Sequence, residues 1–419
     1  MNKDSNAGKE NFQENVDDCR CWPEEDYPIE KYPVWSILVL CYKNRALLDG
    51  MLKSIFSQDY PRIRLIVSDD GSADFDVEAV KEFIEENKEA NIVEYRVQKN
   101  AKNMKTVPHI SKCLEDSGEY FVFTAADDRF VRNDAITKYN RAFAANPEAV
   151  WLVAKCNVVT PDYQRSIYIT PTVEDDPFFV SGDAKSLFSR WSRRGMAVPC
   201  SMAFKRAALE AVGGIDPSYT YLEDWPLELK LCRNGYAPIY LPYITAAHSS
   251  GGVTNSNETY GVEVRRSFYD DKQRLFQQEV EPYMDMLAPE DREAYRIYQH
   301  EIFDRSYFFN IEWEGAPRFK KLKLALSSWQ HFWWIVEQQY MKRCADLDRK
   351  KLLLASQFLL LISYFMLSPG NTWSLSSFFK IVGAIDFIAA LFIVVFAVAS
   401  VPVEIMCKRK AELRQQLVN

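Results

Sequence analysis

Residues 36–72, SILVLCYKNRALLDGMLKSIFSQDYPRIRLIVSDDGS, decide the fold. The apolar run at 35–40 is typical of a buried parallel strand, and apolar residues then recur at helical spacing until Pro61 ends the helix. A second apolar run follows at 63–68. Strand, helix and strand in this order predict a right-handed crossover between parallel strands.

The same alternation continues outward from this stretch. Strands are expected at 92–97, 120–125, 150–155 and 165–169, and helices at 77–87, 107–114, 205–212 and 224–234. Repeated strand–helix units predict an α/β fold built on a parallel sheet. The sequence contains no GxGxxG or Walker loop, which excludes dehydrogenases and P-loop enzymes.

The composition is that of a globular protein with appendages. The chain has 419 residues, 47% of them hydrophobic and 26% charged, and is too long for one compact core. Its formal net charge of -7 argues against nucleic acid as the main partner. The nine cysteines show no metal-ligand spacing, so we expect free thiols in a reducing compartment.

The composition and the predicted secondary structure change along the chain. Residues 1–31 are polar, have no signal peptide and are expected to be a disordered tail, which keeps the catalytic body in the cytoplasm. The strand–helix alternation spans 32–255, and a helical accessory region follows at 256–345. Within it, basic residues mixed with Trp and Phe at 318–343 favour either an amphipathic helix in the membrane interface or an aromatic helix packed on its own domain.

The last region, 346–419, contains two apolar runs and a basic tail. The runs at 352–367 and 378–406 have Lys and Arg on their outer sides, so the positive-inside tendency predicts a transmembrane hairpin with both ends in the cytoplasm. Because the first run is short, a re-entrant hairpin that never crosses the membrane stays open. A buried soluble hairpin is the third alternative.

Acidic residues occur where predicted strands end. Asp70 follows the strand at 63–68, and Asp127 and Asp128 follow the strand at 120–125. In open α/β sheets, ligands bind at the carboxyl ends of the strands. Asp127 and Asp128 could ligate a divalent cation, Mn²⁺ or Mg²⁺, that compensates the charge of a leaving diphosphate. A solvated loop pair or a helix cap is the alternative for these two aspartates.

Glu223, Asp224 and Trp225 open the predicted helix at 224–234. A carboxylate at a helix start that faces a cleft could act as general base for an acceptor hydroxyl, and Trp225 could offer a flat surface for sugar stacking. The alternative for Asp224 is an N-cap.

Three more residues are candidates for polar contacts. His248 could complete the metal coordination or bind diphosphate; otherwise it is a packed or surface residue. Arg193 and Arg194 could meet a phosphate of the donor or of the acceptor, and a solvated helix end is the alternative.

Four stretches together resemble the family-two glycosyltransferases with the GT-A fold. They are residues 36–72, GEYFVFTAADDRF at 118–130, SMAFKRAALEAVGGID at 201–216 and YLEDWPLELKLCRNGYAPIYLP at 221–242. Their order and spacing match, and the similarity covers residues 33–254. The resemblance implies a GT-A nucleotide-diphospho-sugar transferase fold, which is a Rossmann-like mixed sheet, over 32–255. The C-terminal helical region would then be membrane-associated.

The resemblance also implies roles for single residues. Leu40 and Tyr42 match positions at the nucleotide, where Tyr42 lines the base, and Asp70 matches the carboxylate that binds uracil. Asp127 and Asp128 match the end of the DxD-type motif, which contacts ribose and ligates the metal. Which of these two aspartates is the direct ligand stays open.

Asp224 matches the catalytic base of inverting members, with Glu223 as its neighbour. Two departures from the family pattern matter. Ala125 stands where many relatives carry an earlier Asp, so the metal site would rely on Asp127 and Asp128 alone. The QxxRW motif of processive synthases is absent, which favours addition of a single sugar over polymerisation.

We therefore expect a metal-dependent inverting transfer from a nucleotide-diphosphate sugar, with UDP-sugars favoured, to a membrane-held acceptor. The resemblance favours a polyprenyl-diphosphate-linked saccharide in bacterial surface polysaccharide synthesis, at the cytoplasmic side of the inner membrane. A polyprenyl-phosphate sugar synthase is the first rival, because its phosphate acceptor needs no base. A membrane protein that binds sugar nucleotides without turnover and a nucleotidyltransferase are the others.

Overall fold

The computed structural model describes residues 29–251, 262–299 and 307–313, together with residues 317, 320 and 324. Two compact units divide the chain, Met1–Gln299 and His300–Asn419. The predicted membrane hairpin at 346–419 lies outside the described residues, as does nearly all of the aromatic segment at 318–343. Among the helices that are described, none is both long and apolar enough to span a bilayer.

The expectation of a disordered tail at 1–31 is wrong for its last three residues. Ile29–Lys31 form a short 3-10 helix, η1. The Arg62 side chain donates Nη1 hydrogen bonds to the carbonyl groups of Glu30 and Tyr32, at 2.6 and 2.8 Å, and so fastens this turn to the body of the protein. Residues 1–28 lie outside the described part of the chain.

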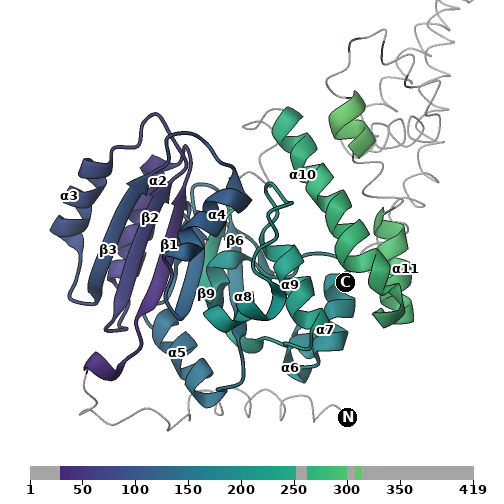
Figure 1. Ribbon diagram of the computed structural model, residues 1–419, viewed down its shortest axis with the longest axis horizontal. Helices are drawn as coiled ribbons and strands as arrows, with labels where there is room; N and C mark the ends of the chain where they lie inside the picture. The colour runs from purple at the N-terminus through teal and green to yellow at the C-terminus, as the bar shows by residue number, and fades with distance from the viewer. Residues whose placement is uncertain are drawn as a thin grey trace, which may run out of the picture. The chain divides into compact units, whose positions relative to one another are not determined.

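In the part of the chain that is described, nine strands form one mixed sheet (Figure 1). Its first half is parallel, in the order β3-β2-β1-β4. The strands are β1 (Trp35–Cys41), β2 (Ile63–Asp69), β3 (Ile92–Lys99) and β4 (Tyr120–Ala125), joined by α2 (Arg45–Phe56), α3 (Val77–Asn87) and α4 (Thr106–Glu115). Each of these elements was predicted. The α/β class and the mixed sheet are confirmed.

The second half of the sheet continues in the order β8-β6-β9-β5, with β7 paired to β6. β6 and β9 are parallel, whereas β4–β8, β6–β8, β6–β7 and β5–β9 are antiparallel. The bounds are β5 (Asp128–Phe130), β6 (Trp151–Val159), β7 (Ser166–Thr170), β8 (Met202–Lys205) and β9 (Ile239–Ser249). The antiparallel pairs correct the expectation of a purely parallel sheet that the strand–helix pattern alone gave.

Helices and short 3-10 turns connect these strands. They are α5 (Ala135–Ala145), α6 (Asp176–Ser181), α7 (Ala184–Trp191), η2 (Pro199–Ser201), α8 (Arg206–Val212) and α9 (Asp224–Arg233). α8 ends in a turn at Gly213 and Gly214, whose φ values of 80° and 84° lie in a region that favours glycine.

The core of the parallel half is built around Trp35 at the start of β1. Its indole is fully buried, stacks on Tyr120 with ring centroids 5.3 Å apart, and donates Nε1–H to Asn140 Oδ1 at 3.1 Å. Since Asn140 belongs to α5, this hydrogen bond satisfies a buried donor and joins that helix to the sheet.

Four further helical elements complete the first compact unit. They are α10 (Val262–Leu275), the π-helix η3 (Phe276–Val280), the 3-10 helix η4 (Glu281–Met286) and α11 (Pro289–Ile297). The Glu279 carboxylate forms ion pairs with Arg233 and Lys230 of α9, at 2.7 and 3.5 Å. These helices therefore belong to the same compact unit as the sheet. In the second unit, Phe308–Trp313 form a π-helix, η6.

Candidate active site

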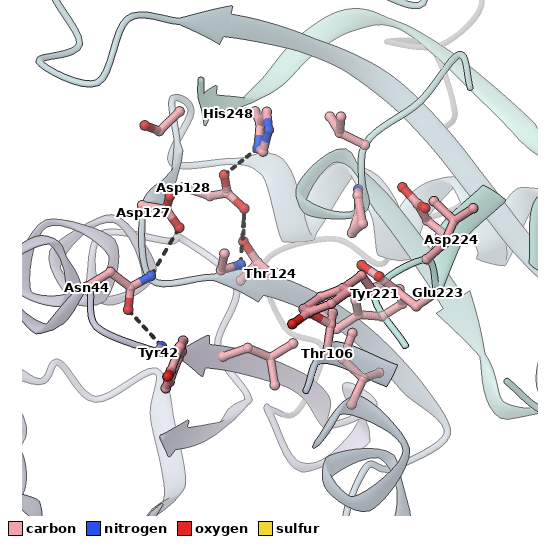
Figure 2. A pocket seen from close by; sticks show the side chains of 18 of the residues that line it. Tyr42, Asn44, Thr106, Thr124, Asp127, Asp128, Tyr221, Glu223, Asp224 and His248 are labelled. Carbon is pink, nitrogen blue, oxygen red and sulfur yellow. Dashed lines mark hydrogen bonds and ion pairs between the residues drawn. The ribbon is translucent and has the colours of Figure 1, made fainter. Parts of the chain in front are cut away.

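One cavity of about 960 Å³ lies at the carboxyl ends of β1, β2 and β4. Three groups of acidic residues line it: Asp70, then Asp127 with Asp128, and Glu223 with Asp224. Figure 2 shows the aspartate pair and Asp224 on either side of this space. The expected convergence of three distant carboxyl groups is therefore found, at the sheet edge where α/β proteins bind their ligands.

Asp70 holds the loop that closes one side of the cavity. Its Oδ1 accepts hydrogen bonds from Asn100 Nδ2 and the Met104 N–H, at 3.0 and 2.8 Å, and its Oδ2 accepts one from the Lys105 N–H at 3.0 Å. Gly71 has φ +82°, and a Cβ there would lie 2.8 Å from the backbone of this loop. Because a carboxylate has about four acceptor positions, Asp70 retains one for a ligand N–H.

The loop after β1 connects the nucleotide side of the cavity to the acidic pair. Asn44 Oδ1 accepts the Tyr42 N–H at 3.0 Å, and Asn44 Nδ2 donates to Asp127 Oδ1 at 3.2 Å (Figure 2). The Lys43 N–H donates to Ser72 Oγ at 2.8 Å. Leu40 and Tyr42 line the cavity as well. Sequence reasoning missed Asn44, although an asparagine after a strand is a usual turn-former.

Asp128 and His248 meet because β5 and β9 pair in the register that places them opposite each other. His248 Nδ1 lies 2.8 Å from Asp128 Oδ1, and Asp128 Oδ2 accepts hydrogen bonds from Thr124 Oγ1 and the Ala125 N–H, both at 3.0 Å. Burial lowers the pKa of His248, but the Asp128 carboxylate outweighs burial and raises it well above its usual value. His248 is thus an ion-pair partner inside the cavity.

Asp127 carries the carboxylate of the pair with the fewer hydrogen bonds. Burial, together with the charge of the neighbouring Asp128, raises the pKa of Asp127 to about 6, although the Asn44 hydrogen bond lowers it. The Tyr163 hydroxyl donates a hydrogen bond to the Asp127 carbonyl oxygen and so holds the backbone at this position. The Arg129 guanidinium covers the Tyr163 ring, 3.8 Å from its centroid.

These residues fit a divalent cation. Ligand atoms of Asp128, His248 and Cys200 all lie within 4.8 Å of one another. Asp127 is not one of the residues of this cluster; burial and then the charge of the neighbouring Asp128 raise its pKa. Carboxylate oxygen suits Mg²⁺ and Mn²⁺, and imidazole nitrogen is an additional ligand for transition metals. The hydrogen bond with Cys156 and burial raise the pKa of the Cys200 thiol, which therefore stays protonated.

α9 begins at Asp224, with Glu223 at the N-cap position. The reading of Asp224 as an N-cap is therefore wrong; its Oδ1 accepts the Trp225 N–H at 2.7 Å from the first helical position. Burial raises the pKa of both carboxyl groups, and in Glu223 the charge of Asp224 raises it further. A cavity-facing carboxyl with a raised pKa has the property that a general base requires.

Asp271 of α10 holds the loop that leads to the Glu223–Asp224 pair. Its buried carboxylate accepts hydrogen bonds from three successive backbone N–H groups: Thr220 at 2.9 Å, Tyr221 at 2.6 Å and Leu222 at 3.2 Å. This residue had no signal in the sequence, because its partners are far away along the chain. The position of the Glu223–Asp224 pair thus depends on a helix beyond the sheet.

Trp225 is more deeply buried than a residue that stacks against a sugar needs to be. The residue lines the cavity, but it is only 5% exposed. Its Nε1–H donates to the Trp191 carbonyl at 2.8 Å, and its ring lies edge-on to Phe276 at 5.9 Å. Little surface therefore remains for a sugar.

Arg193 and Arg194 are not a solvated helix end. Arg193 Nη1 pairs with Asp291 at 3.2 Å and Arg194 Nη2 with Asp175 at 2.8 Å. The Arg194 side chain reaches the cavity lining, whereas Arg193 is absent from that lining. Of the two, only Arg194 is placed for contact with a ligand.

Residues 36–213 match the family model of Glycosyl transferase family 2. This matched segment, less than half of the chain, is similar to that family. The match includes Asp70, Asp127 and Asp128 of the cavity, and it ends before Glu223 and Asp224. The mixed α/β sheet fits the GT-A fold that the resemblance implied.

Several solved structures are similar to the chain at low identity. Mannosyltransferase PcManGT from Pyrobaculum calidifontis, in complex with GDP-Man and Mn²⁺, is 18% identical, with 90% of this chain and 93% of that chain covered and a TM-score of 0.45. S. aureus TarS 1-349 is 14% identical, with 67% and 90% covered and a TM-score of 0.44. Its complex with UDP is 13% identical, with 90% and 92% covered and a TM-score of 0.45. These scores are too low to carry a residue role over to this chain. The comparison with curated proteins found no match.

Asp127→Asn is expected to stabilise the metal-free protein at pH 8 but not at pH 4. The folded-state pKa of Asp127 is about 6, above its ordinary value, so stability present at low pH is lost as the pH rises through 6. Removing the charge should restore about 1–3 kcal/mol at pH 8. Thermal unfolding in EDTA at both pH values measures the difference, with exposed Asp74→Asn as control. An identical pH dependence in wild type and Asp127→Asn would contradict this electrostatic account.

Asp271→Ala is expected to destabilise the protein by about 1–3 kcal/mol, because three buried N–H groups lose their acceptor. Urea unfolding measures the loss. Asp270→Ala is the matched control, since Asp270 is the exposed neighbour on the same helix. Equal stability of the two variants would show that Asp271 does not hold the loop.

Proposed function

We propose that this protein is a metal-dependent inverting glycosyltransferase that moves a sugar from a nucleoside diphosphate donor, with UDP-sugars as first candidates, to an acceptor hydroxyl. The observation that supports this function is the single cavity lined by Asp70, by the Asp127–Asp128 pair and by Asp224. A nucleotide-sugar transferase needs these three functions in one space: base recognition, charge compensation and a general base.

The donor half of the reaction uses residues at the ends of β1, β2 and β4. Asp70 accepts an N–H of the base through its remaining acceptor position, with Leu40 and Tyr42 beside it. Asp127 and Asp128 would hold the divalent cation, with His248 next to Asp128. When bound, the cation compensates the charge that develops on the leaving diphosphate.

The acceptor half depends on Asp224. Its carboxylate takes the proton of the acceptor hydroxyl, whose oxygen bonds to the anomeric carbon as the bond from that carbon to the diphosphate breaks. Attack from the face opposite the diphosphate inverts the anomeric configuration. Burial raises the pKa of Asp224, which makes it a stronger base than an exposed aspartate.

A membrane-held acceptor is part of this proposal. It is supported by the two apolar runs at 352–367 and 378–406 and their basic flanks, which favour attachment to a bilayer from the cytoplasmic side. A lipid-linked saccharide at the bacterial inner membrane is the acceptor that fits this placement.

Asp224→Asn is expected to abolish sugar transfer while nucleotide binding stays within twofold of wild type. Loss of a general base costs about 10²–10⁴-fold in rate. Radiolabelled donor with membrane extract as acceptor source measures transfer, and calorimetry measures binding. Exposed Glu210→Gln is the control for loss of one carboxylate. Full activity of Asp224→Asn would end the base assignment and favour transfer to a phosphate, which needs no base.

Sugar nucleotides with Mn²⁺ are expected to raise the melting temperature of the wild-type protein, and EDTA should remove most of the shift. Ligand at 100 times its Kd stabilises the folded state by about 2.7 kcal/mol. A thermal-shift screen of UDP-, GDP-, CDP- and dTDP-sugars measures the effect and ranks the bases. No shift with any of them, with or without metal, would contradict the proposed function.

A further inference from the structure

One face of α10 forms a wall of the cavity. Val264, Phe268 and Lys272 are spaced by four residues, so they lie on the same side of the helix, and all three line the cavity. Tyr298, which follows α11, lines it as well. This wall is apolar except for one ammonium group, and it lies beyond residues 36–213, the segment that matches the glycosyltransferase family.

Lys272 is a partly buried cation with no carboxylate partner at ion-pair distance among the residues that the structure describes. Its Nζ lies 5.0 Å from the centre of the Phe268 ring. Burial lowers the pKa of this ammonium group, which means that its charge is poorly solvated. A partly desolvated cation that faces a cavity favours an anionic ligand.

The position of Lys272 assigns it to the acceptor side of the cavity. Its neighbour Asp271 binds the N–H groups of the 220–222 loop, directly before Glu223 and Asp224. Two further lysines line the cavity: Lys43 lies in the loop after β1, and the Lys105 ammonium group lies 6.0 Å from the centre of the Tyr221 ring. Consecutive residues of α10 thus hold the catalytic loop and face the space in front of it.

We propose that the α10 face is an acceptor subsite for a phosphate group joined to an apolar chain. Lys272 binds the phosphate, and Val264, Phe268 and Tyr298 contact the chain. This inference rests on the proposed function, because it requires that Asp224 marks the acceptor side. It identifies the acceptor class by chemistry alone: an anionic lipid-like carrier in which apolar and charged parts are adjacent.

The test uses geranyl diphosphate as the probe and the full-length protein, with UDP and Mn²⁺ present to occupy the donor side. Calorimetry should show binding to wild type, and Lys272→Met should raise the Kd about tenfold or more through loss of a charge-assisted contact. Arg266→Met removes a positive charge from the exposed side of the same helix and should leave the Kd unchanged. UDP affinity should be equal in all three proteins.

Phe268→Ala separates the apolar part of the subsite from the charged part. It should weaken geranyl diphosphate and leave inorganic pyrophosphate unaffected, whereas Lys272→Met should weaken both. Circular dichroism melts of each variant confirm that it is folded.

An unchanged Kd for geranyl diphosphate in Lys272→Met would overturn the proposal. So would an equal loss of UDP affinity in that variant, because Lys272 would then serve the donor diphosphate. If the wild type binds no nucleoside diphosphate, the proposed function fails by itself. The same titration without nucleotide still decides whether α10 binds a lipid phosphate.

Discussion

Hydrogen bonds from backbone N–H groups to buried carboxylates hold the loops of this site in place. Asp70 accepts hydrogen bonds from the N–H groups of residues 104 and 105, and Asp128 accepts one from the Ala125 N–H. Asp271 accepts hydrogen bonds from the N–H groups of the 220–222 loop. Each bond is charge-assisted and satisfies a main-chain donor away from bulk water. The loops that form the cavity therefore derive their positions from acidic side chains on neighbouring elements.

Because the site contains several buried carboxyl groups, its negative charge is not fully compensated until a ligand binds. Burial raises the pKa of Asp127, Glu223 and Asp224, so each carboxyl favours a proton, a cation or an acceptor hydroxyl over bare ionisation. Asp128 differs because His248 neutralises it. The two adjacent aspartates therefore differ in their surroundings: Asp128 accepts hydrogen bonds from Thr124 and the Ala125 N–H, whereas Asp127 accepts one from Asn44.

The parallel half of the sheet was predictable because its signals are local. β1, β2 and β4 are continuous apolar runs, and the helices between them show their own periodicity. β5 was missed because it has three residues, and β9 because its Pro242 and polar positions break the apolar pattern. Asp70 and Asp128 were found as strand-end acids. Asp271 was not, because its role depends on contacts made only after the chain has folded.

The Gly213–Gly214 turn after α8 divides the residues that line the cavity into two groups along the chain. Asp70, Asp127 and Asp128 come before it, whereas Asp224, His248 and α10 come after it. Both groups are needed for the cavity, because His248 on β9 lies opposite Asp128 on β5. A cut of the backbone at this turn would separate the acidic pair from its histidine and leave neither fragment with the whole cavity.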